Sequence, residues 1–123
     1  MERVVKSGLG WRIGWNPEAG EFTGLVGSDD WAIELTQAEL EDFCQLLSQL
    51  STSMEAIAHE LMDQEKITCE AETNLLWMEV AGYPHAYTLR LILHSGRRSE
   101  AYWSESVVPD LWQAVQSLQV FLR

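Results

Sequence analysis

Hydrophobic and polar residues alternate along much of the chain with the period of a half-buried strand. Trp11, Ile13 and Trp15, for example, alternate with Arg12 and Gly14. The same pattern predicts further strands over residues 21–26, 31–35, 67–72, 75–81, 87–94 and 99–104. Because short turns join most of these segments, we expect them to pair in antiparallel fashion.

A longer stretch in the first half has the spacing of an amphipathic helix. Thr36 and Glu39 stand three residues apart, as in a capping box at a helix start. Apolar residues then recur at the a and d positions of a heptad: Leu40, Phe43, Leu47, Leu50, Met54, Ile57 and Leu61. We expect this helix to reach about Glu65, with a kink or restart at residues 51–53, where two serines flank a threonine.

The second half repeats this order of strands followed by a helix. Pro109 suits the first turn of the closing helix. The buried face of that helix is predicted to contain Leu111, Ala114, Val115, Leu118 and Leu122. Residues 11–17 also resemble residues 77–84, so the repeats span about 9–65 and 66–123. The prediction is an α+β fold, with an antiparallel sheet packed by two helices in a single domain over residues 1–123.

Length and composition agree with one globular domain. The chain has 123 residues, of which 46% are hydrophobic, enough for a substantial core. No apolar run approaches the ~20 residues of a membrane span, and the first ten residues do not have the pattern of a signal peptide. We therefore expect a cytoplasmic protein in which Cys44 and Cys69 are reduced.

The charge of the chain is strongly negative and unevenly distributed. The formal net charge is −11, which opposes nonspecific binding to nucleic acid. Residues 37–65 contain seven acidic residues and no basic one, whereas the charges of residues 66–104 cancel. The second set of strands is thus neutral and has room for a locally basic face.

Three segments give the chain a resemblance to a known fold. They are Gly10-Trp11-Arg12-Ile13-Gly14-Trp15, Trp31-Ala32-Ile33-Glu34-Leu35-Thr36 and Pro109-Asp110-Leu111-Trp112. With the doubled strands-then-helix layout, they resemble a small uncharacterised cyanobacterial family placed in the single-stranded-DNA-binding transcriptional regulator superfamily, which includes the plant Whirly proteins. The resemblance covers nearly the whole chain and implies a Whirly-like fold whose sheet surface binds single strands. This sequence departs from that pattern, because it has no lysine-rich strand and its net charge is negative.

Several polar residues have spacings that catalysis or metal binding could use. Glu55, His59 and Asp63 lie four residues apart on the first helix, although a solvated acidic face explains them as well. Cys44 and Cys69 lack a C-x-x-C spacing and a basic neighbour, and we interpret both as small core residues.

A hydrolytic triad could in principle be drawn from residues near the strand ends of the second half. The candidates are His85, His94, Ser104, Glu105 and Ser106, but no nucleophile-elbow sequence supports them. The prediction is therefore that the chain has no catalytic residues, no metal site and no cofactor.

Six tryptophans are many for this length, and they have two possible roles. Alternation with apolar neighbours places Trp31 and Trp103 in the core. The others could pack in the core or, beside arginines, form a stacking platform. The possible interaction surface comprises Trp11, Arg12, Trp15, Trp77, Arg90, Arg97 and Arg98.

These observations leave three hypotheses for function, which itself stays unassigned. The first, favoured by the heptad seam and the aromatic surplus, is a non-enzymatic binding or adaptor protein that acts through contacts with a protein partner or a second copy. The second is a single-stranded nucleic-acid-binding regulator, which the resemblance supports and the charge opposes. The third is a small-ligand binder or enzyme, for which the sequence offers only disconnected polar residues.

Overall fold

The computed structural model describes residues 3–60, 65–94 and 96–122. Four strands precede a helix, and this order then repeats. The first half contains β1 (Val4–Gly8), β2 (Trp11–Trp15), β3 (Gly24–Gly27), β4 (Ala32–Leu35) and α1 (Gln37–Ala58). The second half contains β5 (Ile67–Glu72), β6 (Leu76–Tyr83), β7 (Ala86–Leu93), β8 (Glu100–Trp103) and α2 (Val108–Leu122).

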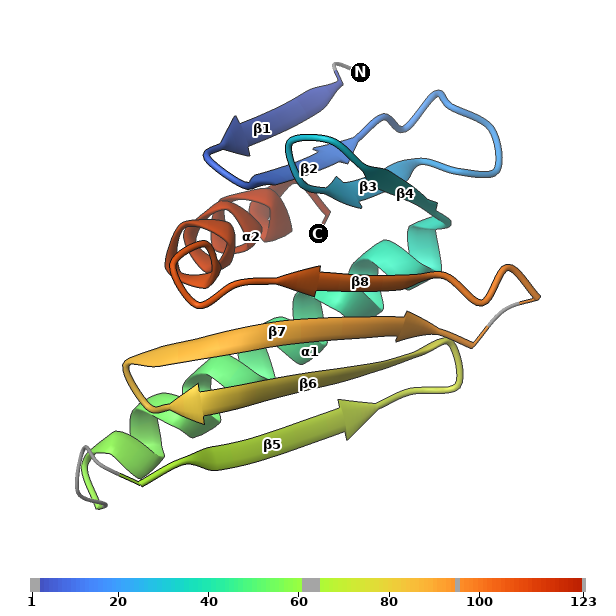
Figure 1. Cartoon of the computed structure of the whole chain (residues 1–123). Coiled ribbons are helices and arrows are strands. Elements are labelled where there is room, and N and C mark those ends of the chain that lie inside the picture. Colours follow the sequence, from blue (N-terminus) through green and yellow to red (C-terminus); the bar gives the residue numbers. More distant parts are fainter. Residues whose placement is uncertain (1–2, 61–64, 95, 123) are drawn as a thin grey trace.

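The strands form two sheets, with all neighbours antiparallel. Sheet A has the order β1-β2-β3-β4, and sheet B has the order β5-β6-β7-β8. Each helix packs mainly on the sheet of the other half: α1 lies behind sheet B, against β5 and β6, whereas α2 lies against β1 and β2 of sheet A (Figure 1). The two halves thus exchange helices, and each completes the core of the other.

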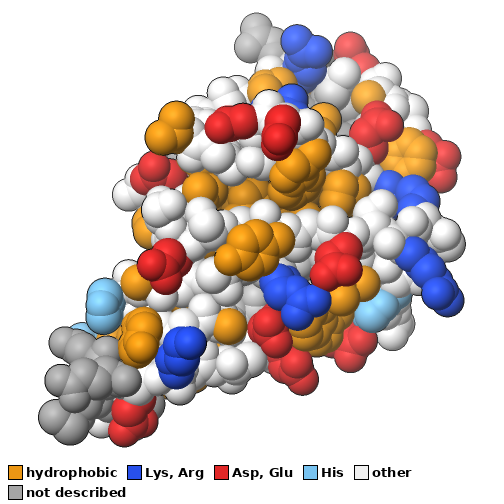
Figure 2. Space-filling model, viewed as in Figure 1, with side chains coloured by type: hydrophobic (Ala, Val, Ile, Leu, Met, Phe, Trp, Pro, Cys, Tyr) orange, Lys and Arg blue, Asp and Glu red, His pale blue; other side chains and the backbone are white. Residues whose placement is uncertain are grey.

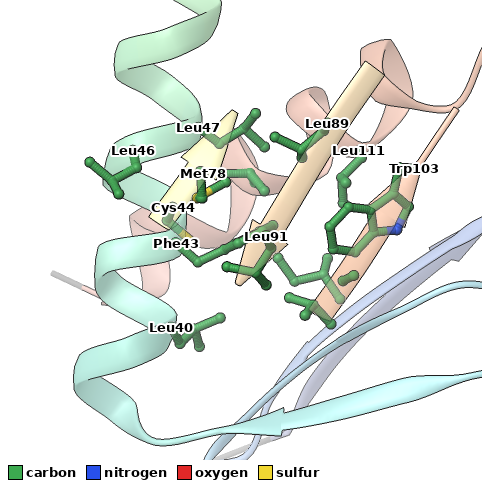
Figure 3. Packing of buried hydrophobic residues seen from close by; sticks show 14 of the residues in the cluster. Leu40, Phe43, Cys44, Leu46, Leu47, Met78, Leu89, Leu91, Trp103 and Leu111 are labelled. Atoms are coloured by element: carbon green, nitrogen blue, oxygen red, sulfur yellow. The ribbon is translucent and has the colours of Figure 1, made fainter. Parts of the chain in front are cut away.

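The apolar seam predicted for α1 is buried in this shared core. Leu40, Phe43, Leu47, Leu50 and Met54 are all 2% exposed or less, and Ile57 is half-buried. Leu61 lies outside the described residues. Figure 3 shows Phe43 and Leu47 of α1 directed toward Met78, Leu89 and Leu91 of sheet B. Because the seam residues are buried against other elements of the same chain, they are not free to pack against a second copy. The seam therefore does not support the homodimer that it suggested from sequence.

Trp103 joins the two halves at the centre of the molecule. It is 1% exposed, and its Nε1 donates a hydrogen bond to the carbonyl oxygen of Gly27 at 2.9 Å. Its ring centroid lies 5.4 Å from that of Trp31 and 5.9 Å from that of Phe43. The expected core positions of Trp31 and Trp103 are thus confirmed, since Trp31 is half-buried against the same cluster.

The capping box of α1 is confirmed, but the other two predictions for this helix are wrong. Thr36 and Glu39 exchange both expected hydrogen bonds, at 2.8 and 3.2 Å. The helix continues without a break through residues 51–53, because Ser51 is buried and accepts a hydrogen bond from Tyr87. It ends at Ala58 rather than near Glu65, in a tightened turn in which the N–H of His59 contacts the carbonyl oxygen of Ala56.

In sheet A, the structure differs from the predictions in having an additional first strand, β1, and in the residue at which β3 begins. β1 is absent from the predictions, because Val4, Val5 and Lys6 show no alternation, and the first repeat therefore begins before residue 9. β3 begins at Gly24 rather than residue 21. Thr23 instead closes the preceding turn, where its carbonyl oxygen accepts a hydrogen bond from the N–H of Asn16 at 2.7 Å.

Candidate functional site

The residues that the sequence singled out as a possible interaction surface lie in three different places. Trp11 and Trp15 face the helices and are each only 8% exposed. Gly8 makes room for Trp11, because a Cβ atom at residue 8 would lie 2.4 Å from the indole nitrogen. The Nε1 of Trp15 donates a hydrogen bond to Oε1 of Gln37 at 2.8 Å. Neither indole therefore offers a free ring face on which a base could stack.

Arg12 and Arg97 bind segments of the chain that are distant from them in the sequence or across a turn. The Arg12 guanidinium donates hydrogen bonds to the carbonyl oxygens of Ser28 at 2.6 Å and Trp31 at 2.9 Å, which holds the β3–β4 turn. Arg97, in the turn between β7 and β8, donates to the carbonyl oxygen of Glu34 and to the buried Glu39 carboxylate.

Arg97 thereby ties sheet B to sheet A. Its guanidinium also lies over the Phe22 ring, 4.7 Å from the centroid. Its neighbour Arg98 is exposed, with a positive φ of 47° that suits the turn. Among the described residues, Arg98 forms no hydrogen bond or ion pair, so it is the arginine of this turn that remains open to solvent.

Trp77 and Arg90 come together on the solvent side of sheet B. The Arg90 guanidinium lies 5.5 Å from the Trp77 ring centroid. Strand register brings further residues to the same side, with Trp77 opposite Ile92 and Arg90 opposite Tyr102. We call this the sheet B outer face and define it as Glu70, Glu72, Trp77, Glu79, Arg90, Ile92, Glu100 and Tyr102.

Carboxylates surround the aromatic centre of the sheet B outer face. Arg90 forms ion pairs with Glu100 at 2.8 Å and with Glu79 at 3.7 Å. The hydrogen bond with Glu100 raises the pKa of Arg90 above its ordinary value. Figure 2 looks onto this side and shows hydrophobic side chains interspersed with acidic ones. With four carboxylates and one guanidinium, the face is acidic rather than basic.

Sequence reasoning missed Tyr102 and Ile92 on this face. Tyr102 is 54% exposed, the most open of the aromatic side chains on sheet B. The signal was present, because Ala101 and Trp103 point inward and alternation then directs Tyr102 outward. The prediction that Trp103 lies in the core therefore already implied that Tyr102 faces solvent.

A shallow hollow lies on the solvent side of sheet A. Its volume is about 300 Å³, and its lining includes Val5, Gly14, Leu25 and Phe22. Val5 is 58% exposed. Arg3, Arg12 and Glu34 also line the hollow. Its described lining contains no tyrosine and its tryptophan, Trp15, is buried, which distinguishes it from the sheet B outer face.

The polar residues considered for catalysis are dispersed. Nε2 of His94 lies 2.6 Å from Oε2 of Glu72, and the His85 ring stacks on Tyr83 with centroids 6.3 Å apart. The hydroxyl groups of Ser104 and Ser106 lie 3.3 Å apart. These contacts do not bring a histidine and a serine together as a triad requires.

Two of the three α1 residues whose spacing suits metal ligands lie in the described part of the chain. Glu55 and His59 are exposed near the end of the helix, whereas Asp63 lies outside the described residues. Over the part of the chain that the structure describes, there is no group of three or more His, Cys, Asp or Glu residues placed to hold a metal ion.

The two cysteines occupy the core side of the fold. Cys44 is 1% exposed on α1, and Cys69 is half-buried on β5. Both are free thiols in the described structure. Burial, aided by the nearby charge of Glu41, raises the pKa of Cys44 to about 12. This thiol therefore lacks the thiolate character of a catalytic cysteine.

The described residues form an α+β protein of two antiparallel sheets and two helices. The chain belongs to the DUF1818 family, a domain of unknown function, whose profile matches residues 6–118. A search of curated proteins returned no match.

A solved structure has the same fold. It is the crystal structure of a protein of unknown function from Prochlorococcus sp. NATL2A, described as a member of the DUF155 family. That protein is 31% identical to this chain, with a TM-score of 0.87 over 94% of this chain and 98% of its own. The predicted α+β fold class is therefore confirmed. Neither match names the Whirly proteins, so that resemblance stays a prediction.

Neither of the two helices is a candidate for a membrane span. Within residues 3–60, 65–94 and 96–122, no helix combines the length and the apolar character that crossing a bilayer requires.

Proposed function

We propose that this protein is a non-enzymatic binding or adaptor protein that acts through protein contacts, with the sheet B outer face as its docking surface. The observation that carries the proposal is the composition of that face. Tryptophan, tyrosine and arginine dominate the energetics of protein interfaces, and Trp77, Tyr102 and Arg90 lie together here on neighbouring strands.

A protein suits this face better than a single-stranded nucleic acid. Binding to single strands depends on unpaired cations that neutralise phosphates, with base stacking added. Arg90 is held by Glu79 and Glu100, and Glu70 and Glu72 add further negative charge. The nucleic-acid-binding regulator therefore remains the alternative that rests on the Whirly resemblance alone.

The geometry of the face also limits what kind of partner it suits. Trp77 and Ile92 form one cross-strand row and Arg90 and Tyr102 the next, so a broad partner surface can contact all four. The acidic frame favours a partner with basic residues around an apolar centre. We expect a different protein or a second copy of this chain, in the cytoplasm.

Site-specific photocrosslinking tests the proposal. A photoreactive phenylalanine analogue replaces Tyr102 in one variant and Gln49, which is exposed on α1, in the control variant. The expected result is a discrete crosslinked species from residue 102 and not from residue 49 after irradiation in cells. A product twice the mass of the chain would identify a second copy as the partner.

The crosslink should also depend on the aromatic centre. Trp77→Ala in the residue 102 variant should abolish the product, because the proposed partner contacts both side chains. Equal products from residues 102 and 49, or a product unaffected by Trp77→Ala, would contradict docking at this face.

A further inference from the structure

A separate pocket opens where the two helices meet the β6–β7 turn. Its volume is about 380 Å³, and the side chains that matter here are Glu55 of α1, Tyr87 of β7 and Trp112 of α2. Both aromatic residues are half-buried and pack against the core on one side. The Tyr87 hydroxyl donates a hydrogen bond to the buried Ser51 at 3.1 Å, which holds the ring in place. The pocket thus has two aromatic walls, each packed on the core.

The charge beside these walls is negative. Glu55 is exposed at the mouth of the pocket. Burial raises the pKa of Tyr87, and the negative charge of Glu55 raises it further, although the hydrogen bond with Ser51 opposes both. The carboxylate therefore lies close enough to influence the aromatic group. Among the described residues that line the pocket, none is a lysine or an arginine, and His85 of the β6–β7 turn is the basic side chain present.

At two other places in this chain, an arginine lies over an aromatic ring and pairs with a carboxylate. Arg90 lies over Trp77 and pairs with Glu100, and Arg97 lies over Phe22 and pairs with Glu39. In both places a planar guanidinium covers an aromatic ring and meets a carboxylate at its edge. The pocket presents the aromatic ring and the carboxylate but supplies no arginine of its own.

We propose that this pocket receives an arginine side chain from a protein partner, with the guanidinium stacked on Trp112 or Tyr87 and paired with Glu55. The site is distinct from the sheet B outer face and goes beyond the docking function proposed for it. Arginine is preferred over lysine because its flat, weakly hydrated fork both stacks on rings and pairs with carboxylates.

The surroundings are compatible with a cation. The N-terminal end of α2 lines the pocket through Val108 and Pro109 and brings a partial positive charge to it. Asp110 stands in the first turn of α2 and offsets this charge. The segments Gln37–Ala58 and Val108–Leu122 contain no lysine or arginine, so no basic side chain of either helix competes for the carboxylate.

A titration monitored by NMR tests the proposal on the intact chain. The probe is a blocked glycine–arginine–glycine tripeptide, and its matched control replaces arginine with neutral citrulline. The expected result is a saturable shift of the Trp112 indole resonance, assigned with Trp112→Phe, for the arginine peptide and not for the citrulline peptide. Glu55→Gln should weaken binding about threefold to fivefold, as expected for loss of one exposed charge pair.

Glu41→Gln is the matched control, because it removes the same charge from an exposed position elsewhere on α1. It should leave binding unchanged. The proposal is overturned if the arginine peptide gives no saturable shift, if citrulline binds equally well, or if Glu41→Gln weakens binding as much as Glu55→Gln. None of these outcomes bears on crosslinking from residue 102, so the two proposals can fail separately.

Discussion

Sheet A directs Trp11 toward the helices, whereas sheet B directs Trp77 toward solvent, although the sequence segments that contain them resemble each other. Trp11 is 8% exposed and belongs to the core, while Trp77 lies beneath the Arg90 guanidinium on the outer face. The difference arises from strand parity. In β2 the core-facing residues include Trp11 and Ile13, but in β6 they are Leu76, Met78 and Val80.

A shift of one residue along a strand is enough to reverse the face that a side chain occupies. The repeat therefore preserves the order of elements but not the role of the aligned tryptophans. One copy strengthens the core, and the other places a half-buried aromatic ring beneath Arg90 on the outer face. Repeated sequence is thus a guide to architecture here and a poor guide to which residues contact a partner.

Paired alanine substitutions test this contrast and should give the largest effect. Trp11→Ala should lower the free energy of unfolding by about 3–5 kcal/mol, because it leaves a cavity under α2. Trp77→Ala should lower it by about 1 kcal/mol or less, since the ring contributes only cross-strand contacts. Urea denaturation followed by circular dichroism measures both. Equal losses for the two variants would show that the faces do not differ as described.

The turn arginines offer a second contrast of smaller size. Arg97→Gln should cost about 1–3 kcal/mol, because it removes charge-assisted hydrogen bonds and leaves the buried Glu39 carboxylate without its guanidinium partner. Arg98→Gln, the adjacent control, should change the free energy of unfolding by no more than about 0.5 kcal/mol. The same denaturation experiment applies. If Arg98→Gln proved the more damaging, the tie between the sheets would have been assigned to the wrong residue.

The two cysteines differ in burial, and their alkylation rates should differ accordingly. At pH 8, burial should make alkylation of Cys44 by iodoacetamide at least about a thousandfold slower than in denaturant, since the thiol pKa rises from 9.0 to about 12. Cys69, half-buried on the edge strand β5, should react faster than Cys44. Mass spectrometry of the native protein over time measures both rates. Rapid alkylation of Cys44 would indicate that the α1 core opens readily.

Much of the fold could be predicted from local pattern. The capping box at Thr36, the apolar seam of α1 and the alternation in β2 each depend on nearest neighbours along the chain, and the structure confirms them. The exchange of helices between halves could not be predicted, because a seam shows that a helix is buried but not which sheet covers it.

The candidate surface was harder to predict for a related reason. Arg12 and Arg97 look like free cations in the sequence, but their partners are backbone carbonyls and a carboxylate far along the chain. Likewise, Glu55, Tyr87 and Trp112 come from three separate elements and meet only in the folded molecule. Contacts between distant segments produce no periodic pattern in the sequence, so they could not be predicted from it. The outward direction of Tyr102, in contrast, followed from alternation alone.

We propose that the aromatic face of sheet B serves protein contacts, because its arginine is already paired with carboxylates. A fluorescence-anisotropy titration of a labelled single-stranded oligonucleotide at ~0.15 M salt distinguishes this role from nucleic-acid binding. We expect binding weaker than micromolar, with little effect of Arg90→Ala or of Arg97→Ala combined with Arg98→Ala. Saturable submicromolar binding that either set of substitutions abolishes would contradict the claim and favour a nucleic-acid-binding regulator.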